Sequence, residues 1–266
     1  VSQKSILEKS GASHAQLKAL VDKGILITEK RKIDRLKNEG GIGNQALHEL
    51  SKQQQAALDS IKTQLEKYPV HLLHGITGSG KTQIYVALIN ELIKKGQQAL
   101  YMLPEIALTA QMIRRLRQYF GNSIAIYHSK FNPNERVEIW NKVKTGEIKI
   151  VLGARSALFL PYKDLSLIIV DEEHDGSYKQ QDPAPRYQAR DTAIYYANKL
   201  NAKVILGSAT PSVESFYNAE NKKYGYTHLT ERFNQGALPT IQIIDTKKQP
   251  TGTAILTPLL LAEIKK

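Results

Sequence analysis

The sequence contains no cysteine, and this excludes both a disulfide framework and a metal site built from thiolates. No apolar run approaches the roughly 20 residues that a membrane-spanning helix needs, and the first residues lack the apolar segment of a signal peptide. Acidic residues are outnumbered: 25 Asp and Glu stand against 37 Lys and Arg, which gives a formal net charge of +12. We therefore expect a soluble, cytoplasmic protein. The positive charge is compatible with a polyanionic partner but does not require one.

Four parts can be distinguished along the chain. Residues 1–37 are typical of a winged-helix-like unit, because a helix capped by Ser13 and Gln16 is followed by an apolar strand pattern and a basic stretch. The segment 38–49 is a predicted linker. Residues 50–232 have the pattern of one larger domain, and residues 233–266 predict one more strand and the beginning of a helix. Since the chain starts without methionine and stops within that helix pattern, we expect a piece of a longer protein.

The larger domain alternates short apolar runs with amphipathic stretches. The predicted strands are residues 70–75, 98–104, 123–128, 148–154, 165–172 and 203–210. The predicted helices between them are residues 82–96, 106–121, 134–147 and 189–201. This alternation indicates an α/β fold with a mostly parallel sheet and helices on both faces. Ligands of such sheets bind at the carboxyl ends of strands, so functional residues should directly follow the strands.

The first predicted strand runs into "GITGSGKT", which matches the phosphate-binding pattern G-x-x-x-x-G-K-[ST]. Glycines let backbone N–H groups wrap a phosphate chain, and the helix that follows adds its positive amino-terminal end. Lys81 is predicted to reach the β- and γ-phosphates of a nucleotide, and the Thr82 hydroxyl to ligate Mg²⁺. The predicted nucleotide-binding residues of this loop are Gly75, Thr77, Gly78, Ser79, Gly80, Lys81 and Thr82.

The stretch "LIIVDEEHDGSYKQQ" carries a buried strand into four carboxylates and a histidine. So many acidic groups at the end of a buried strand are costly unless a cation lies near them. Asp171 stands where a P-loop site has its second Mg²⁺-holding residue, and Glu172 is suited to polarise the water that attacks the γ-phosphate. Lys81, Asp171 and Glu172 are therefore the predicted catalytic residues, with Thr82 and Asp171 on the metal.

The "DEEH" string also resembles the second motif of superfamily 2 helicases. This resemblance implies a P-loop NTPase of the RecA-like type, with a glutamine ahead of the phosphate loop that reads adenine, here Gln54. It further implies that the "GSAT" string couples hydrolysis to movement along DNA. The residues implied in this coupling are His174, Ser208 and Thr210.

Longer strings narrow the resemblance, namely "LPEIALT", "GARSALF", "DEEHDGSYKQQ" with "RYQARD", and "GSATPSVES". Together they closely resemble the PriA (primosomal protein N′) family of bacterial replication-restart helicases. The resemblance implies an ATP-dependent 3′-to-5′ DNA helicase that uses ATP and Mg²⁺ in replication restart and primosome assembly, with this chain as its ATP-binding lobe. It implies forked and single-stranded DNA, primosome components and single-stranded DNA-binding protein as partners, and zinc bound outside this chain.

The segment after "DEEH" resembles the aromatic-rich loop that senses single-stranded DNA in this family. Aromatic rings stack on bases without sequence preference, and arginines add positive charge. The predicted DNA-binding residues, in this loop and after an earlier strand, are Arg155, Ser156, Tyr178, Arg186 and Tyr187. Pro185 and Gln188 depart from the family pattern, so an ordinary surface loop is the alternative.

Two other functions stay open. The first is a nucleotide- and DNA-binding module without turnover, and the second is another superfamily 2 nucleic-acid motor. The basic residues within 1–37 either contact DNA or form a solvated face. Trp140 lies in an amphipathic helix pattern and is predicted to be part of the core.

Overall fold

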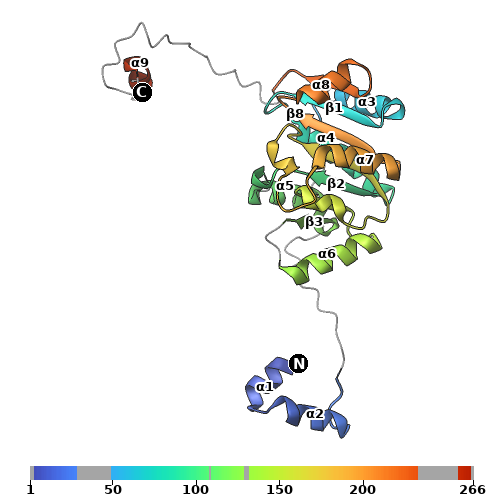
Figure 1. Ribbon diagram of the computed structural model, residues 1–266, viewed down its shortest axis with the longest axis vertical. Coiled ribbons are helices and arrows are strands. Elements are labelled where there is room, and N and C mark those ends of the chain that lie inside the picture. The colour runs from blue at the N-terminus through green and yellow to red at the C-terminus, as the bar shows by residue number, and fades with distance from the viewer. Residues whose placement is uncertain (1–2, 29–48, 108, 129–131, 233–256, 265–266) are drawn as a thin grey trace.

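The computed structural model describes residues 3–28, 49–107, 109–128, 132–232 and 257–264. Its main element is a seven-stranded sheet in which every pairing is parallel (Figure 1). From one edge to the other the strands are β3 (Ile124–Tyr127), β4 (Ile150–Gly153), β2 (Gln98–Met102), β5 (Leu165–Asp171), β8 (Lys203–Ser208), β1 (Val70–Gly75) and β9 (Gly225–Leu229). The six predicted strands are all present, and the parallel sheet is confirmed.

The central strands are apolar on both faces. In β5, Leu167 and Ile169 belong to one hydrophobic core, while Ile168 and Val170 belong to the other. All four side chains are buried. Burial on both faces explains why these strands appear in the sequence as continuous apolar runs rather than alternating patterns.

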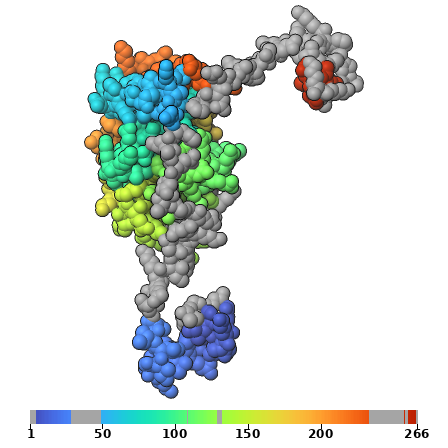
Figure 2. Space-filling model, turned by 180° about the vertical axis from the view of Figure 1, so that it is seen from behind, coloured from blue at the N-terminus to red at the C-terminus, as the bar shows by residue number. Residues whose placement is uncertain are grey.

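Among the described helices, three cover each face of the sheet (Figure 1). The core that contains Leu167 is closed by α3 (Lys52–Lys67), α4 (Lys81–Lys94) and α5 (Ala110–Phe120). The core that contains Ile168 is closed by α6 (Pro133–Thr145), α7 (Ala189–Leu200) and α8 (Val213–Glu220). Helix α3, in light blue, lies on the outside of the sheet domain in the space-filling view (Figure 2). The predicted cover of both faces is confirmed.

Strand β8 lies between β5 and β1, although it is the last of the three along the chain. The register pairs Asp171 at the end of β5 with Gly207 on β8, and Ser208 on β8 with His74 on β1. The carboxyl ends of these three strands therefore meet at one edge of the sheet. This is the edge at which ligands of parallel sheets bind.

Other parts of the domain differ from the sequence-based prediction. Strand β9 extends the sheet beyond β1, and a two-stranded antiparallel hairpin is formed by β6 (Lys179–Gln180) and β7 (Tyr187–Gln188). The prediction that Trp140 lies in the core is wrong, because its side chain is 45% exposed. The buried residues of α6 are Ile139 and Val143 instead.

Outside the sheet domain the structure describes three short helices. The predicted capping box of Ser13 and Gln16 begins α2 (His14–Asp22), which follows α1 (Gln3–Ser10). Residues 25–28 form no strand, and the basic stretch from residue 29 and nearly all of the predicted linker lie outside the described residues, so the winged-helix unit stays a prediction. The strand predicted after residue 233 also lies outside them, while the helix start is seen as α9 (Pro258–Ile264). None of the described helices is long and apolar enough to cross a membrane.

Candidate nucleotide and DNA site

The phosphate-loop motif connects the end of β1 to the first turn of α4. Gly78 and Gly80 have φ angles of 82° and 84°, a left-handed conformation that residues with a Cβ atom rarely adopt. Gly80 is the N-cap of α4 and makes no side-chain cap hydrogen bond, so the first N–H groups of the helix have no capping side chain. Such a helix start is suited to bind an anion.

Two side chains of the loop fit a phosphate chain. The buried Lys81 ammonium donates a hydrogen bond to the Gly75 carbonyl at 2.8 Å. The Ser79 hydroxyl is buried and has no hydrogen-bond partner in the described part of the chain. A buried hydroxyl without a partner costs free energy, and a phosphate oxygen at this position would satisfy it.

The structure places Gln54 against the phosphate loop. Its side chain is 1% exposed, and its Nε2 donates to the Ser79 carbonyl at 3.1 Å. Its Oε1 accepts from the Ser51 N–H at 3.0 Å, as part of the capping box of α3. Gln54 thus braces the phosphate loop in this structure, and its recognition of adenine stays a prediction.

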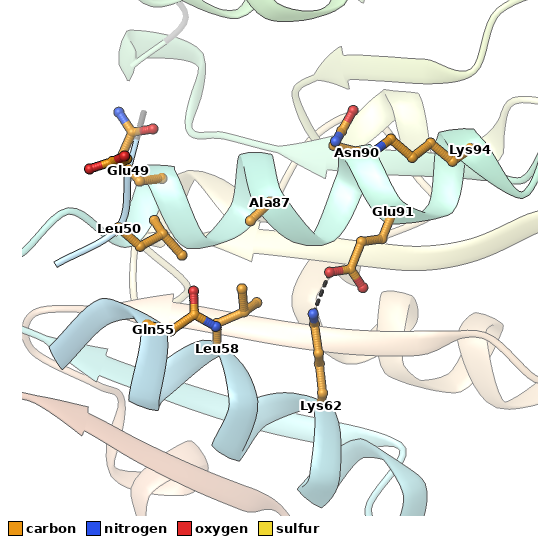
Figure 3. Close-up of a pocket in the computed structure, with 10 residues that line it drawn as sticks. Glu49, Leu50, Gln55, Leu58, Lys62, Ala87, Asn90, Glu91 and Lys94 are labelled. Carbon is orange, nitrogen blue, oxygen red and sulfur yellow. Dashed lines mark hydrogen bonds and ion pairs between the residues drawn. The ribbon is translucent and has the colours of Figure 1, made fainter. Parts of the chain in front are cut away.

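A hollow of about 550 Å³ lies beside the loop, between α3 and α4 (Figure 3). Leu50, Leu58 and Ala87 face one another across it, and an ion pair between Lys62 and Glu91 lies at one end. The other lining residues are Glu49, Gln55, Gln83, Asn90 and Lys94. One of these lining residues, Gln83, directly follows Thr82 in the chain, so the hollow lies next to the end of the phosphate-loop motif.

Asp171 ends β5 and is held by three buried tyrosines. The hydroxyl of Tyr85, on α4, donates to Oδ1 at 3.1 Å, and that of Tyr101, on β2, donates to Oδ2 at 3.0 Å. The hydroxyl of Tyr178 donates to the Asp171 backbone carbonyl at 2.6 Å. The carboxylate is thus fixed from two elements of the domain and its backbone from a third.

The pKa of the Asp171 carboxyl is raised to about 6, chiefly by burial and then by the nearby Glu172 charge. The hydrogen bond from Tyr101, the Lys81 charge and the hydrogen bond from Tyr85 limit this rise. At neutral pH the carboxyl group is mostly ionised, and a cation beside it would stabilise the buried charge.

The two glutamates that follow Asp171 have opposite environments. Glu172 has a φ of 49°, an uncommon left-handed conformation for a residue other than glycine, and its side chain is 41% exposed. Glu173 is 0% exposed and accepts hydrogen bonds from the Ser212 N–H at 2.7 Å, the Ser215 hydroxyl at 2.8 Å and the Arg190 guanidinium at 3.1 Å. The Glu172 carboxylate is thus accessible to water, while Glu173 joins β5 to α7 and α8.

The three residues predicted to couple hydrolysis to movement come together. His174 Nδ1 lies 2.8 Å from the Ser208 hydroxyl, and its Nε2 lies 3.4 Å from the Thr210 hydroxyl. The Ser208 hydroxyl in turn accepts from the Thr210 N–H at 2.9 Å. His174 Nδ1 is also 3.8 Å from the Glu172 carboxylate, so the end of β8 is connected to the residue predicted to polarise water.

The residues predicted to bind DNA differ in exposure: four lie at or near the surface and Tyr178 is buried. The Arg155 guanidinium donates to the Ser177 carbonyl at 2.8 Å, and Tyr187 lies edge-on against Phe159, with ring centroids 5.2 Å apart. Arg186 is exposed and Ser156 is half-buried. Tyr178 is only 1% exposed. The ring of Tyr178 is therefore not available for stacking on bases in this structure, and its hydroxyl supports Asp171 instead.

Several residues of the site were not among those predicted. They are Tyr85, Tyr101, Phe159, Glu173 and Arg190. Three of them carried a signal, because Phe159, Glu173 and Arg190 lie within the "GARSALF", "DEEH" and "RYQARD" strings. Tyr85 and Tyr101 are brought to the site by the fold alone.

The chain matches known protein families and curated relatives over most of its length. The DEAD/DEAH box helicase family model matches residues 51–218. The replication restart protein PriA of Bacillus subtilis (strain 168) is 37% identical over 247 residues, which cover 92% of this chain and 31% of that protein. PriA of Haemophilus influenzae is 44% identical over 211 residues, which cover 79% of this chain and 29% of that protein. The chain thus spans about a third of the length of the relatives it matches.

A solved structure of RecG bound to a three-way DNA junction has a TM-score of 0.51 and 22% identity, and covers 68% of this chain and 24% of that chain. This likeness supports the fold, and the PriA relatives confirm the resemblance inferred from the sequence strings. With the family model covering most of the sheet domain, the chain belongs to the DEAD/DEAH box helicase family.

Proposed function

We propose that this chain is the ATP-binding lobe of a DNA helicase that moves 3′ to 5′ and acts in replication restart. The observation that carries the proposal is the meeting of three motifs at one sheet edge: the phosphate loop after β1, "DEEH" after β5 and "GSAT" at the end of β8. A helicase domain of this family implies the use of a nucleotide and Mg²⁺. The PriA relatives support the role in replication restart.

In this proposal the phosphate loop binds the β- and γ-phosphates through its N–H groups, Lys81 and Ser79. Thr82 and Asp171 would hold Mg²⁺, which would supply positive charge to the phosphates. Glu172 accepts the proton of the attacking water, and its exposed side chain is compatible with this role. A second lobe of the whole protein would complete the stabilisation of the transition state.

The same residues support a route from the nucleotide to DNA. Tyr178 contacts the Asp171 backbone, and the neighbouring Ser177 carbonyl accepts from Arg155. Beyond them lie the exposed Phe159 and its partner Tyr187 on the hairpin. We propose that these two rings, with Arg155 and Arg186, face single-stranded DNA, as bases stack on aromatic rings.

The partners of the whole protein follow from the same relatives. We propose forked and single-stranded DNA as its substrates, and primosome components and single-stranded DNA-binding protein as its protein partners. RecG, the structural neighbour, is itself bound to a DNA junction. Zinc is proposed to bind elsewhere in the whole protein, and the cytoplasm is the proposed location.

The function is tested by the ATPase activity of the full-length protein with DNA or RNA added. We expect single-stranded DNA to stimulate hydrolysis and RNA of the same length to have little effect. Strong stimulation by RNA would favour another superfamily 2 motor. No stimulation by either would favour a binding module without turnover.

Removing the aromatic rings at the proposed DNA surface should weaken DNA binding. Tyr187→Ala and Phe159→Ala are each expected to lower affinity for an oligo-dT strand about 5- to 150-fold, because a stacked base contributes roughly 1–3 kcal/mol. DNA-stimulated ATPase should fall with it, while the affinity for ATP stays unchanged. Fluorescence anisotropy at fixed salt and a steady-state ATPase assay measure the two quantities.

A matched control is Tyr195→Ala. Tyr195 is 65% exposed on α7, and lines a shallow groove with Val70 at the amino end of β1, away from the carboxyl edge. Its loss should leave DNA affinity unchanged. If all three variants bind DNA like the unchanged protein, the hairpin is an ordinary surface loop.

A further inference from the structure

The hydrogen bonds of Asp171 distinguish its two carboxylate oxygens. A carboxylate oxygen has about two acceptor positions. Oδ1 accepts from the Tyr85 hydroxyl at 3.1 Å and from the Glu172 N–H at 3.2 Å, so both of its positions are filled. Within the described residues, Oδ2 accepts from the Tyr101 hydroxyl alone, at 3.0 Å. One acceptor position of the carboxylate therefore remains open, and it belongs to Oδ2.

Tyr101 also lies close to the phosphate loop. The Thr82 side chain is near enough to the Tyr101 hydroxyl to influence its pKa. Tyr101 is thus near both side chains proposed to hold Mg²⁺: its hydroxyl donates to Asp171 Oδ2, and Thr82 lies beside it in the first turn of α4.

The place of Tyr85 depends on the absence of a side chain at Gly207. A Cβ atom at position 207 would lie 1.7 Å from the Tyr85 hydroxyl and 3.1 Å from Asp171 Oδ1. Glycine in the "GSAT" string is therefore what lets Tyr85 reach Oδ1. The rings of Tyr85 and Tyr101 also pack against each other, with centroids 5.5 Å apart and an angle of 74° between their planes. The arrangement is specified by packing as well as by hydrogen bonds.

From these contacts we propose that Tyr101 and Tyr85 are positioning residues for Mg²⁺: they hold the Asp171 carboxylate so that Oδ2 faces the metal. Tyr85 and the Glu172 N–H occupy Oδ1, and Tyr101 fixes the orientation of Oδ2, which keeps an open acceptor position. The proposal rests on the proposed function, in which Thr82 and Asp171 hold Mg²⁺. Hydrogen bonds to a metal-binding carboxylate typically matter about 10- to 100-fold in metal affinity.

The alternative is that the tyrosines only fill the core, since a buried tyrosine hydroxyl usually finds some hydrogen-bond partner. The two explanations predict different effects of Mg²⁺ on nucleotide binding by the variants. A tyrosine that only fills the core changes stability when its hydroxyl is removed. A positioning tyrosine also changes the Mg²⁺ concentration at which nucleotide binding tightens.

The test measures binding of fluorescent ADP to the 266-residue chain at increasing Mg²⁺ concentration. Tyr101→Phe is expected to raise the Mg²⁺ concentration for half-maximal effect about 10-fold, and Tyr85→Phe less than about 3-fold, because the Glu172 N–H still holds Oδ1. Affinity for ADP in EDTA should be unchanged in both. In an Asp171→Asn background, Tyr101→Phe should add nothing.

Tyr162→Phe is the matched control, because the Tyr162 hydroxyl donates to the Ala157 carbonyl at 2.9 Å, and Ala157 is not one of the proposed nucleotide or metal residues. An unshifted Mg²⁺ response in folded Tyr101→Phe would overturn the proposal. If the unchanged chain shows no Mg²⁺ response, the proposed function itself fails at this site. Should Tyr101→Phe not fold, a crystal structure of the unchanged chain with Mg²⁺–ADP decides, since a metal on the Oδ1 side contradicts the proposal.

Discussion

Glu172→Gln is expected to bind Mg²⁺–ATP nearly as well as the unchanged protein and to hydrolyse it about 10²–10⁴ times more slowly. The amide keeps the size of the carboxylate but cannot accept the proton of the attacking water. Glu172 is suited to this experiment because its side chain is 41% exposed and its contact with His174 Nδ1, at 3.8 Å, is itself partly exposed. Single-turnover hydrolysis by the full-length protein and binding of fluorescent ATP measure the two effects.

Two variants show whether the loss is specific. Lys81→Ala should lose nucleotide binding together with hydrolysis, because it removes the charge that faces the phosphates. Asp175→Asn removes a carboxylate from the same turn, one whose side chain accepts a hydrogen bond from the Ser177 N–H. It should leave hydrolysis unchanged. A Glu172→Gln protein with a rate within a few-fold of the unchanged one would show that another group activates water.

Glu173→Ala should destabilise the domain by about 3–5 kcal/mol, because it removes the buried partner of an ion pair. Arg190, whose side chain is only 10% exposed, would keep the exposed Asp191 but lose its buried acceptor. The Ser212 N–H and the Ser215 hydroxyl would also lose their acceptor. For a domain of this size the melting temperature should fall by roughly 6–20 °C, which thermal unfolding followed by circular dichroism measures.

Asp191→Ala is the control on the same guanidinium. The Asp191 carboxylate accepts from Arg190 at 2.8 Å, but its side chain is 60% exposed. An exposed pair contributes about 0–1 kcal/mol, so this variant should melt within a few degrees of the unchanged protein. Equal melting temperatures for Glu173→Ala and Asp191→Ala would mean that water reaches Glu173 and that the network does not hold α7 and α8 to β5.

The sequence predicts the fold and the nucleotide residues because both depend on local patterns. The six apolar runs correspond to strands, and "GITGSGKT" lies between a strand and a helix as predicted. His174, Ser208 and Thr210, which are proposed to couple hydrolysis to movement, could be named because the "DEEH" and "GSAT" strings that contain them resemble helicase motifs. That they touch one another is a result of β8 lying beside β5, which local patterns do not specify.

Long-range contacts explain what the sequence does not reveal. Nothing near Tyr101 in the chain distinguishes it from other aromatic residues of a buried strand, and its partner Asp171 is on another strand. Glu173 stands in the same acidic run as Glu172, and only the fold separates a buried carboxylate from an exposed one. The resemblance assigns Gln54 to adenine, and nothing in the local sequence indicates that its amide contacts the Ser79 carbonyl of the phosphate loop.

The position of β8 has a consequence for the synthesis of the protein. Strand β1 pairs only with later strands: Val70 with Val204 on β8, and His71 with Gly225 on β9. While the chain emerges from the ribosome, β5 can pair with β2, but β1 has no neighbour until β8 appears. Closing so long a loop is entropically costly and slow. A nucleotide stabilises only the chain conformation that binds it. It therefore cannot assist folding until β8, which ends at Ser208, has emerged and brought the phosphate loop after β1 beside Asp171 at the end of β5.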